Sequence, residues 1–272
     1  MKRGSFEALI GSVNKGNAAP GDFTGADGLL HCGKCRKPKQ MRLDGVEKPV
    51  SILCDCAEDQ RRMEEAQARQ KRVDDLRARC LPREAMRRHT FEVADVGRHI
   101  DIARRFVEKW PEMRRSGTGL ALWGNVGTGK SFTAHCIANA LVDMEIPVRC
   151  TSAAEIVAAL AERSTPRSEY MDKLCGVPLL IIDDIGAERE TDYAREQLCA
   201  AIDARVESGR PFVVTTNYSL EEMRNPADPA LARIFDRVLS RCVPVAVVGK
   251  SRREDEATAR LAAARALLED DK

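Results

Sequence analysis

Aromatic side chains make up only 4% of this sequence, and their scarcity argues against a nucleic-acid grip that depends mainly on base stacking. Long apolar runs are missing too. No segment approaches the roughly 20 consecutive apolar residues that a membrane-spanning helix needs, so we expect no membrane association. The segment from Met1 to Phe6 leads into no hydrophobic stretch, and we therefore expect no secretory signal and a cytoplasmic protein.

An excess of charge of one sign is also missing. The 44 Lys and Arg residues nearly balance the 42 acidic residues, for a net charge of +2, so the whole molecule lacks the basic surplus of many nucleic-acid-binding proteins. Basic residues are enriched locally over residues 60–89, where ten of them stand against five acids. Such a run is usually a solvated helix face, and contact with nucleic acid or a partner protein is the alternative.

Cysteine is plentiful, and four of the ten cysteines have the spacing of a metal site. Cys32 and Cys35 form a C-x-x-C pair, and after eighteen intervening residues Cys54 and Cys56 form a C-x-C pair. This spacing allows tetrahedral ligation of Zn²⁺ by four thiolates, with His31 as a possible substitute ligand. Because so short a segment cannot bury enough core to fold alone, we expect structural zinc. A disulfide or redox pair and unligated thiols stay open.

A phosphate-binding loop is the strongest motif of the chain. The sequence matches G-x-x-x-x-G-K-[ST] at Gly124, Asn125, Val126, Gly127, Thr128, Gly129, Lys130 and Ser131. An apolar run precedes it, as a buried strand would, and a helix-forming run beginning at Phe132 follows it. Backbone N–H groups and the helix N-terminus would hold the phosphates, Lys130 would reach the β- and γ-phosphates, and Ser131 would ligate Mg²⁺. A purely structural glycine-rich turn is the alternative, which this context disfavours. We therefore expect the loop residues, together with Phe132, to bind ATP.

A second apolar run, Leu179 to Ile182, ends in two carboxylates. The carboxyl edge of a parallel sheet is where ligands bind in open α/β folds, and the pattern is a Walker-B arrangement. Asp183 would hold the Mg²⁺ shell, and Asp184 would polarise the attacking water. A strand that simply ends in a polar turn is the alternative. Asp is a methylene shorter than the Glu that is commoner at the second position, which predicts either slow hydrolysis or assistance from Glu188.

Polar residues later in the chain extend this site. Asn217 follows a third apolar run and could orient the hydrolytic water, although a lone Asn is more often a cap or turn residue. Arg233, Arg237 and Arg241 share one helical face. Either this face is solvated, or one of the three arginines reaches the γ-phosphate bound by a neighbouring subunit as an arginine finger. Arg252 and Arg253 open the last predicted helix, where one could meet the nucleotide in cis.

Apolar strands alternate with amphipathic helices after residue 118, which predicts a parallel five-stranded sheet covered on both faces. Strands are expected at 119–123, 147–151, 178–183, 211–216 and 243–248. Helices are expected at 57–80, 98–110 (closed by Pro111), 130–143, 152–163, 192–207, 228–240 and 252–268. The predicted order is a flexible arm (1–28), a zinc-binding module (29–60), a linker helix (61–84) and an ATPase domain (85–272).

The motifs, taken in order, resemble those of the AAA+ ATPases of the DnaC/DnaI helicase-loader group, which includes the IstB transposition helpers. The resemblance covers residues 85–255 and rests on Gly-Asn-Val-Gly-Thr-Gly-Lys-Ser, Leu-Leu-Ile-Ile-Asp-Asp-Ile-Gly, Val-Val-Thr-Thr-Asn and Arg-Ile-Phe-Asp-Arg. It implies a P-loop NTPase core of the ASCE class, ATP-controlled binding of single-stranded DNA and self-association through the ATP site. It also implies that the N-terminal domain holds a hexameric replicative helicase.

The resemblance further implies roles for the residues already named. They are the Walker-B acids (Asp183, Asp184), sensor 1 (Asn217), the arginine finger (Arg237 first, Arg233 second) and sensor 2 (Arg252 or Arg253). The leading hypothesis is an ATP-dependent helicase loader, with DNA contacts from basic groups near 152–175 (Arg163, Arg167, Lys173). The alternatives are an IstB-like helper of a DNA transposase and a non-hydrolysing adaptor in which ATP is a structural ligand.

Overall fold

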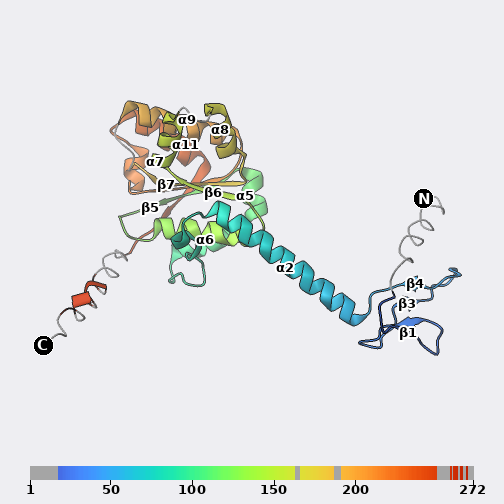
Figure 1. Ribbon diagram of the computed structural model, residues 1–272. Coiled ribbons are helices and arrows are strands. Elements are labelled where there is room, and N and C mark those ends of the chain that lie inside the picture. The colour runs from blue at the N-terminus through green and yellow to red at the C-terminus, as the bar shows by residue number, and fades with distance from the viewer. Residues whose placement is uncertain are drawn as a thin grey trace. The chain divides into compact units, whose positions relative to one another are not determined.

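The computed structural model describes residues 18–162, 166–186 and 191–249, together with positions 258, 260–262, 264, 265 and 268. The chain divides into two compact units, Met1–Lys71 and Arg72–Lys272. The division falls inside helix α2 (Asp55–Cys80) (Figure 1). None of the helices in the described ranges is long and apolar enough to cross a membrane.

The first unit is built from two antiparallel hairpins. Strand β1 (Phe23–Thr24) pairs with β2 (Leu30–His31), and β3 (Gln40–Met41) pairs with β4 (Val50–Ser51). Each strand has only two residues, far fewer than the five or six of an ordinary strand. Hairpins this short bury little apolar surface, so the unit needs another source of stability.

Helix α2 confirms the helix predicted over residues 57–80. Acidic residues occupy its first turn and basic residues its last turn, which suits the helix dipole. Pairs four residues apart, Arg61–Glu65 and Arg62–Glu58, line its exposed surface, where solvent screens them and each adds little stability. Its only buried residues among those described are Val73 and Cys80, so most of the basic run is a solvated helix face.

The second unit contains a parallel five-stranded sheet in the order β6-β7-β8-β5-β9, which confirms the predicted fold class. The strands are β5 (Gly119–Trp123), β6 (Val148–Ser152), β7 (Leu179–Ile185), β8 (Phe212–Thr216) and β9 (Cys242–Ala246). Strand β8 lies between β7 and β5 and pairs with both. The carboxyl ends of these three strands therefore meet at one edge of the sheet.

Helices cover both faces of this sheet (Figure 1). One core joins α4 (Arg98–Glu108) and α6 (Lys130–Asp143) to Leu122, Ile181 and Val213. The other joins α7 (Ala153–Ala161), α9 (Asp192–Glu207) and α11 (Pro229–Arg241) to Ala121, Leu180 and Val214. Neighbouring strand residues thus enter opposite cores, as the two-residue period of a β-strand requires.

Several short helices were not predicted. They are α3 (Glu84–Arg87), α5 (Trp110–Ser116), α8 (Arg167–Gly176) and α10 (Leu220–Arg224). The prediction that Pro111 closes a helix over 98–110 was wrong: α4 ends at Glu108, and Pro111 lies in the first turn of α5. A proline is favoured there because the first N–H groups of a helix have no internal partner. The helix predicted over 252–268 lies largely outside the described residues.

The two outer strands of the sheet expose few free N–H groups. On β6, Val148 N donates to Cys80 Sγ at 3.4 Å and Ser152 N donates to Glu155 Oε2 at 3.1 Å. On β9, the central residue is Pro244, which has no N–H to offer.

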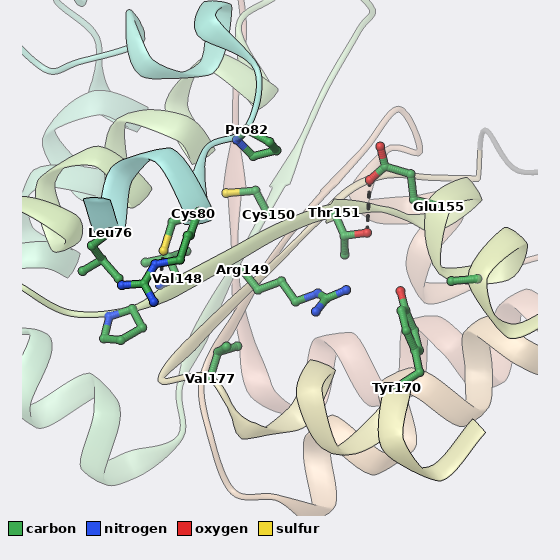
Figure 2. A pocket seen from close by; sticks show the side chains of 13 residues that line it. Leu76, Cys80, Pro82, Val148, Arg149, Cys150, Thr151, Glu155, Tyr170 and Val177 are labelled. Atoms are coloured by element: carbon green, nitrogen blue, oxygen red, sulfur yellow. Dashed lines mark hydrogen bonds between the residues drawn. The ribbon is translucent and has the colours of Figure 1, made fainter. Parts of the chain in front are cut away.

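A groove of about 640 Å³ runs beside β6 (Figure 2), with the Arg149 guanidinium 5.2 Å from the centre of the Tyr170 ring.

Candidate functional site

The predicted phosphate loop connects β5 to α6, and its glycines have backbone angles that other residues avoid. The φ angles of Gly124, Gly127 and Gly129 are 144°, 82° and 99°. A Cβ atom at Gly124 would lie 2.4 Å from the carbonyl oxygen of Val247, which is closer than real contacts allow. The loop therefore requires glycine both for its winding and for its approach to the chain that follows β9.

Side chains of the loop hold it together from within. Lys130 is only 5% exposed, and its ammonium donates to the carbonyl oxygens of Gly124 at 2.9 Å and Asn125 at 2.7 Å. The Thr128 hydroxyl donates to the same Asn125 oxygen at 2.9 Å. Ser131 follows Lys130 in the first turn of α6. A fixed ammonium beside a helix N-terminus is a favourable environment for phosphate.

The two acids of the Walker-B run lie at the carboxyl end of β7, at a β-bulge. The strand extends to Ile185, two residues beyond the predicted end, and its pairing with β8 shifts between Ile182 and Ile185. Asp184 lies in this bulge with a φ of 54°, an uncommon angle for a residue other than glycine. The Thr215 hydroxyl donates to Asp183 Oδ1 at 2.6 Å and accepts from Asp184 N at 2.8 Å.

Asn217 is exposed immediately after β8, between the ends of β7 and β5. The preceding Thr216 donates through its hydroxyl to the carbonyl oxygen of Ile185 at 2.8 Å, which ties the ends of β8 and β7 together. The strand order therefore brings the phosphate loop, the two acids and Asn217 to one edge of the sheet. Ser131 and Asp183 supply hydroxyl and carboxylate oxygens at that edge, and oxygen ligands of this kind suit Mg²⁺.

The predicted arginines have different positions. Arg233 and Arg237 are exposed on α11, beside α9. Arg237 donates to Asp203 at 2.7 Å and to Asp236 at 3.3 Å, and the hydrogen bond to Asp203 raises the pKa of Arg237. In the part of the chain that the structure describes, these contacts do not include the phosphate loop. Arg252 and Arg253 lie outside the described residues.

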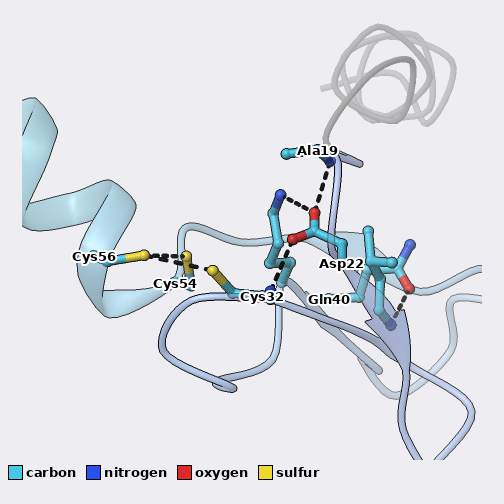
Figure 3. A network of polar contacts seen from close by, with 9 residues as sticks. Ala19, Asp22, Cys32, Gln40, Cys54 and Cys56 are labelled. Atoms are coloured by element: carbon cyan, nitrogen blue, oxygen red, sulfur yellow. Dashed lines mark hydrogen bonds and ion pairs between the residues drawn. The ribbon is translucent and has the colours of Figure 1, made fainter.

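The four predicted zinc ligands come together in the first unit. The sulfur atoms of Cys32, Cys35, Cys54 and Cys56 all lie within 4.8 Å of one another. Cys56 Sγ is 3.5 Å from both Cys32 Sγ and Cys54 Sγ (Figure 3). Tetrahedral ligation at a Zn–S distance of about 2.3 Å places sulfur atoms about 3.8 Å apart, so the cluster fits zinc. His31 is not part of it, because its ring bonds to Asp27 and to the carbonyl of Arg36.

The ionisation of these thiols also favours a cation. Backbone N–H groups of Cys35 and Lys34 lower the pKa of Cys32 to about 6. The hydrogen bond with Cys32 in turn raises the pKa of Cys56 to about 12, and burial raises the pKa of Cys54. Neighbouring thiolates repel each other, so all four ionise together only when a positive ion compensates them.

Asp22 stabilises the turn that carries Cys32 and Cys35, the first pair of predicted ligands. It accepts hydrogen bonds from Ala19 N at 2.7 Å and from Gly33 N at 3.0 Å, and it forms a buried ion pair with Lys39 at 2.6 Å (Figure 3). These contacts lower the pKa of Asp22 to about 2, and the hydrogen bond from Ala19 N has the largest effect. A Cβ at Gly33 would lie 2.2 Å from the carbonyl oxygen of Gly21, so the turn between Cys32 and Cys35 requires glycine there.

Removal of zinc is expected to unfold the first unit and leave the second folded. The reason is that two-residue strands contribute little stability, so a zinc ion held by the four thiolates would be the main stabilising element. Zinc content and limited proteolysis of the full chain before and after chelation check this. Cys54→Ser should lose the bound zinc, whereas Cys175→Ser, which changes a half-buried thiol outside the cluster, should keep one zinc per chain. Unchanged proteolysis of residues 18–71 after complete zinc loss would contradict the prediction.

The sequence analysis did not single out Thr215 or Asp22. Thr215 is a fully buried hydroxyl at the end of an apolar strand, and a polar residue in such a position is a signal that a partner must be nearby. The identity of the partner depends on strand order and register. Asp22 lies ten residues before Cys32, where its contact with the cysteine turn cannot be read from spacing.

Sequence comparisons relate this chain to known proteins. Residues 57–259 match the family described as IstB-like ATP binding protein. Replicative helicase loader DnaI of Bacillus subtilis (strain 168) is 28% identical over 149 residues, which are 50% of this chain and 48% of that protein. Replicative helicase loader DnaC of Escherichia coli (strain K12) is 31% identical over 128 residues, 46% of this chain and 51% of that protein. The chain thus spans about half the length of these curated relatives.

A solved structure shows the same fold. The crystal structure of DnaI superimposes with a TM-score of 0.53 at 23% sequence identity, covering 62% of this chain and 93% of that one. At this level of identity the likeness concerns the fold. It agrees with the fold of the second unit described above.

Proposed function

This chain belongs to the family of IstB-like ATP binding proteins, and we propose that within it the chain acts as an ATP-dependent loader of a replicative helicase in DNA replication. The observation that carries the proposal is the meeting of the phosphate loop with Asp183, Asp184 and Asn217 at one edge of the sheet. The similarity to two helicase loaders supports the choice of partner.

ATP hydrolysis would use residues of this edge. The loop N–H groups and Lys130 would hold the β- and γ-phosphates, while Ser131 and Asp183 would hold Mg²⁺, which when bound neutralises charge on the phosphate oxygens. Asn217 would orient a water, and Asp184 would take its proton as the water oxygen attacks the γ-phosphorus. The bond from that phosphorus to the bridging oxygen breaks, and ADP leaves with the electron pair.

A neighbouring copy of the chain would complete the site. Arg237, or Arg233 as second choice, would reach the γ-phosphate of the adjacent subunit as an arginine finger. Since Arg237 pairs with Asp203 in the single chain, it would exchange this partner for phosphate on assembly. Arg252 or Arg253 would act in cis as sensor 2.

The partners would bind to separate parts of the chain. The zinc module and the basic residues of α2 would hold the hexameric helicase. Single-stranded DNA would contact basic groups near α8, among them Arg167 and Lys173; Arg163, also predicted to contribute, lies outside the described residues. Binding through such groups depends strongly on salt, because it releases counterions from the phosphates.

Retention of helicase by the full-length chain tests the proposal. Immobilised protein with ATP is expected to retain the host's hexameric replicative helicase. A Cys32→Ser/Cys35→Ser variant should lose this retention while its ATP affinity stays unchanged, because the zinc ligands lie in the other unit. Cys175→Ser is the matched control and should retain helicase. Failure of the wild-type chain to retain helicase with either ATP or ADP would refute the loader function.

A second candidate is favoured by the family description itself. An IstB-like helper would bind duplex DNA in an ATP-dependent manner and associate with a transposase. The same immobilised protein, offered duplex DNA and the transposase of a neighbouring gene, distinguishes the two. Binding of transposase without helicase would replace the loader proposal.

A further inference from the structure

Thr215 touches both acids of the candidate ATPase site. It is fully buried on β8, and its hydroxyl oxygen lies 2.6 Å from Asp183 Oδ1 and 2.8 Å from Asp184 N. A hydroxyl has one proton to donate and lone pairs that accept. Because a carboxylate can only accept and a backbone N–H can only donate, the hydroxyl proton must point to Asp183 and a lone pair to Asp184. The orientation of this side chain is therefore fixed.

The bond to Asp184 N acts on an uncommon backbone conformation. Asp184 has a φ of 54° inside the bulge that interrupts the pairing of β7 with β8. Non-glycine residues persist in this region only where surrounding contacts hold them. Thr215 holds the bulge at Asp184 N, and Thr216 holds its far side at the carbonyl of Ile185. The direction in which the Asp184 carboxylate leaves the strand depends on these contacts.

We propose that Thr215 is a positioning residue for ATP hydrolysis: it fixes the Asp183 carboxylate and sets the orientation of Asp184 through one hydroxyl group. The proposal rests on the proposed function, since it assigns Mg²⁺ binding to Asp183 and proton acceptance to Asp184. It differs from the role proposed for Asn217, which would meet the attacking water directly. Thr215 is buried under the acids and acts through them.

Substitution at Thr215 separates the hydroxyl from the shape of the side chain. Thr215→Val keeps the shape and removes both hydrogen bonds, so kcat is expected to fall by about 10- to 100-fold, with KM for ATP changed less than about threefold because the phosphate loop is intact. Thr215→Ser keeps the hydroxyl and should stay within about threefold of wild type. Thr151→Val is the matched control, since it removes another buried strand hydroxyl that bonds a carboxylate, and it should leave kcat unchanged.

A double-mutant cycle shows whether Thr215 acts through Asp184. In an Asp184→Asn background at saturating Mg²⁺, where the loss of the Asp183 contact no longer limits the rate, Thr215→Val should slow hydrolysis by less than about threefold. An equal loss in both backgrounds would overturn the proposal. So would a Thr215→Ser variant as slow as Thr215→Val, because the hydroxyl would then not be the determinant.

A second readout separates this proposal from the proposed function. If wild type shows no hydrolysis above Lys130→Ala, the ATPase proposal fails, and the Mg²⁺ dependence of ATP binding then decides the role of Thr215. Thr215→Val frees the Asp183 carboxylate, so the Mg²⁺ concentration that gives half-maximal ATP binding should rise by about three- to tenfold. Thr215→Ser should return this concentration to the wild-type value. No shift in that concentration would overturn the proposal.

Discussion

Lys130→Ala is expected to abolish ATP hydrolysis and to weaken ATP binding by at least about tenfold. The Lys130 ammonium lies inside the phosphate loop and bonds the carbonyl oxygens of Gly124 and Asn125. Its loss removes the positive charge at the phosphates and the bonds that hold the loop in shape. Transition-state charge contacts of this kind are worth roughly 10²- to 10³-fold in kcat. Phosphate release with and without single-stranded DNA, and binding of a fluorescent ATP analogue, measure the two effects.

Lys109→Ala provides the control for charge alone. Lys109 is exposed beside Glu112 in the same unit, so its loss should change neither binding nor turnover. If wild type and Lys130→Ala release phosphate at the same rate with DNA and helicase present, ATP is a structural ligand. The chain would then be a non-hydrolysing adaptor.

Arg205→Met is expected to destabilise the second unit by about 3–5 kcal/mol. Arg205 is fully buried in the last turn of α9. Its guanidinium donates to four carbonyl oxygens, at distances of 2.5–3.0 Å, from residues that precede β7 and β8: Cys175, Val177, Pro178 and Pro211. Burial lowers the pKa of Arg205 to about 10, so it stays charged at neutral pH. Methionine fills the space but removes this donor from the oxygens of Val177, Pro178 and Pro211, whereas the Cys175 oxygen keeps its bond from Arg210.

Urea denaturation followed by tryptophan fluorescence measures the loss. Arg210→Met is the matched control: Arg210 donates to the same Cys175 oxygen but is exposed, so water can replace it and the loss should be about 1 kcal/mol or less. Arg205→Lys should fall between the two, since lysine has fewer donors and no planar fork. Equal stability of Arg205→Met and Arg210→Met would contradict this interpretation of the buried arginine.

Elements with strong periodic patterns were predicted from sequence. The bounds predicted for β5, α6 and α9 match those in the structure, because an apolar run or a helical stripe ends at clear signals there. Helix α8 was missed because Leu174 is its only buried residue among those described, so it has no apolar stripe to detect. The cysteine cluster was found because its spacing alone limits the geometry.

What depends on strand order could not be predicted in the same way. The bulge at Asp184 exists only relative to β8, and the contact of Thr215 with two acids requires knowing that β8 lies beside β7. Arg205 was not noticed because a charged residue in the last turn of a helix ordinarily faces solvent. It is buried here because α9 packs over the residues that precede β7 and β8, and the carbonyl oxygens of these residues need hydrogen-bond donors. This packing cannot be read from the sequence of the helix.

The two outer strands of the sheet limit how copies of this chain can associate. Extension of a sheet from one molecule to the next requires a row of free N–H and C=O groups. On β6 the N–H groups of Val148 and Ser152 are already used by Cys80 and Glu155, and on β9 Pro244 breaks the row. Growth by strand addition, the usual route to irregular aggregates, is thus disfavoured at both ends. Copies of the chain would instead join through helices and loops, and such contacts can come apart again.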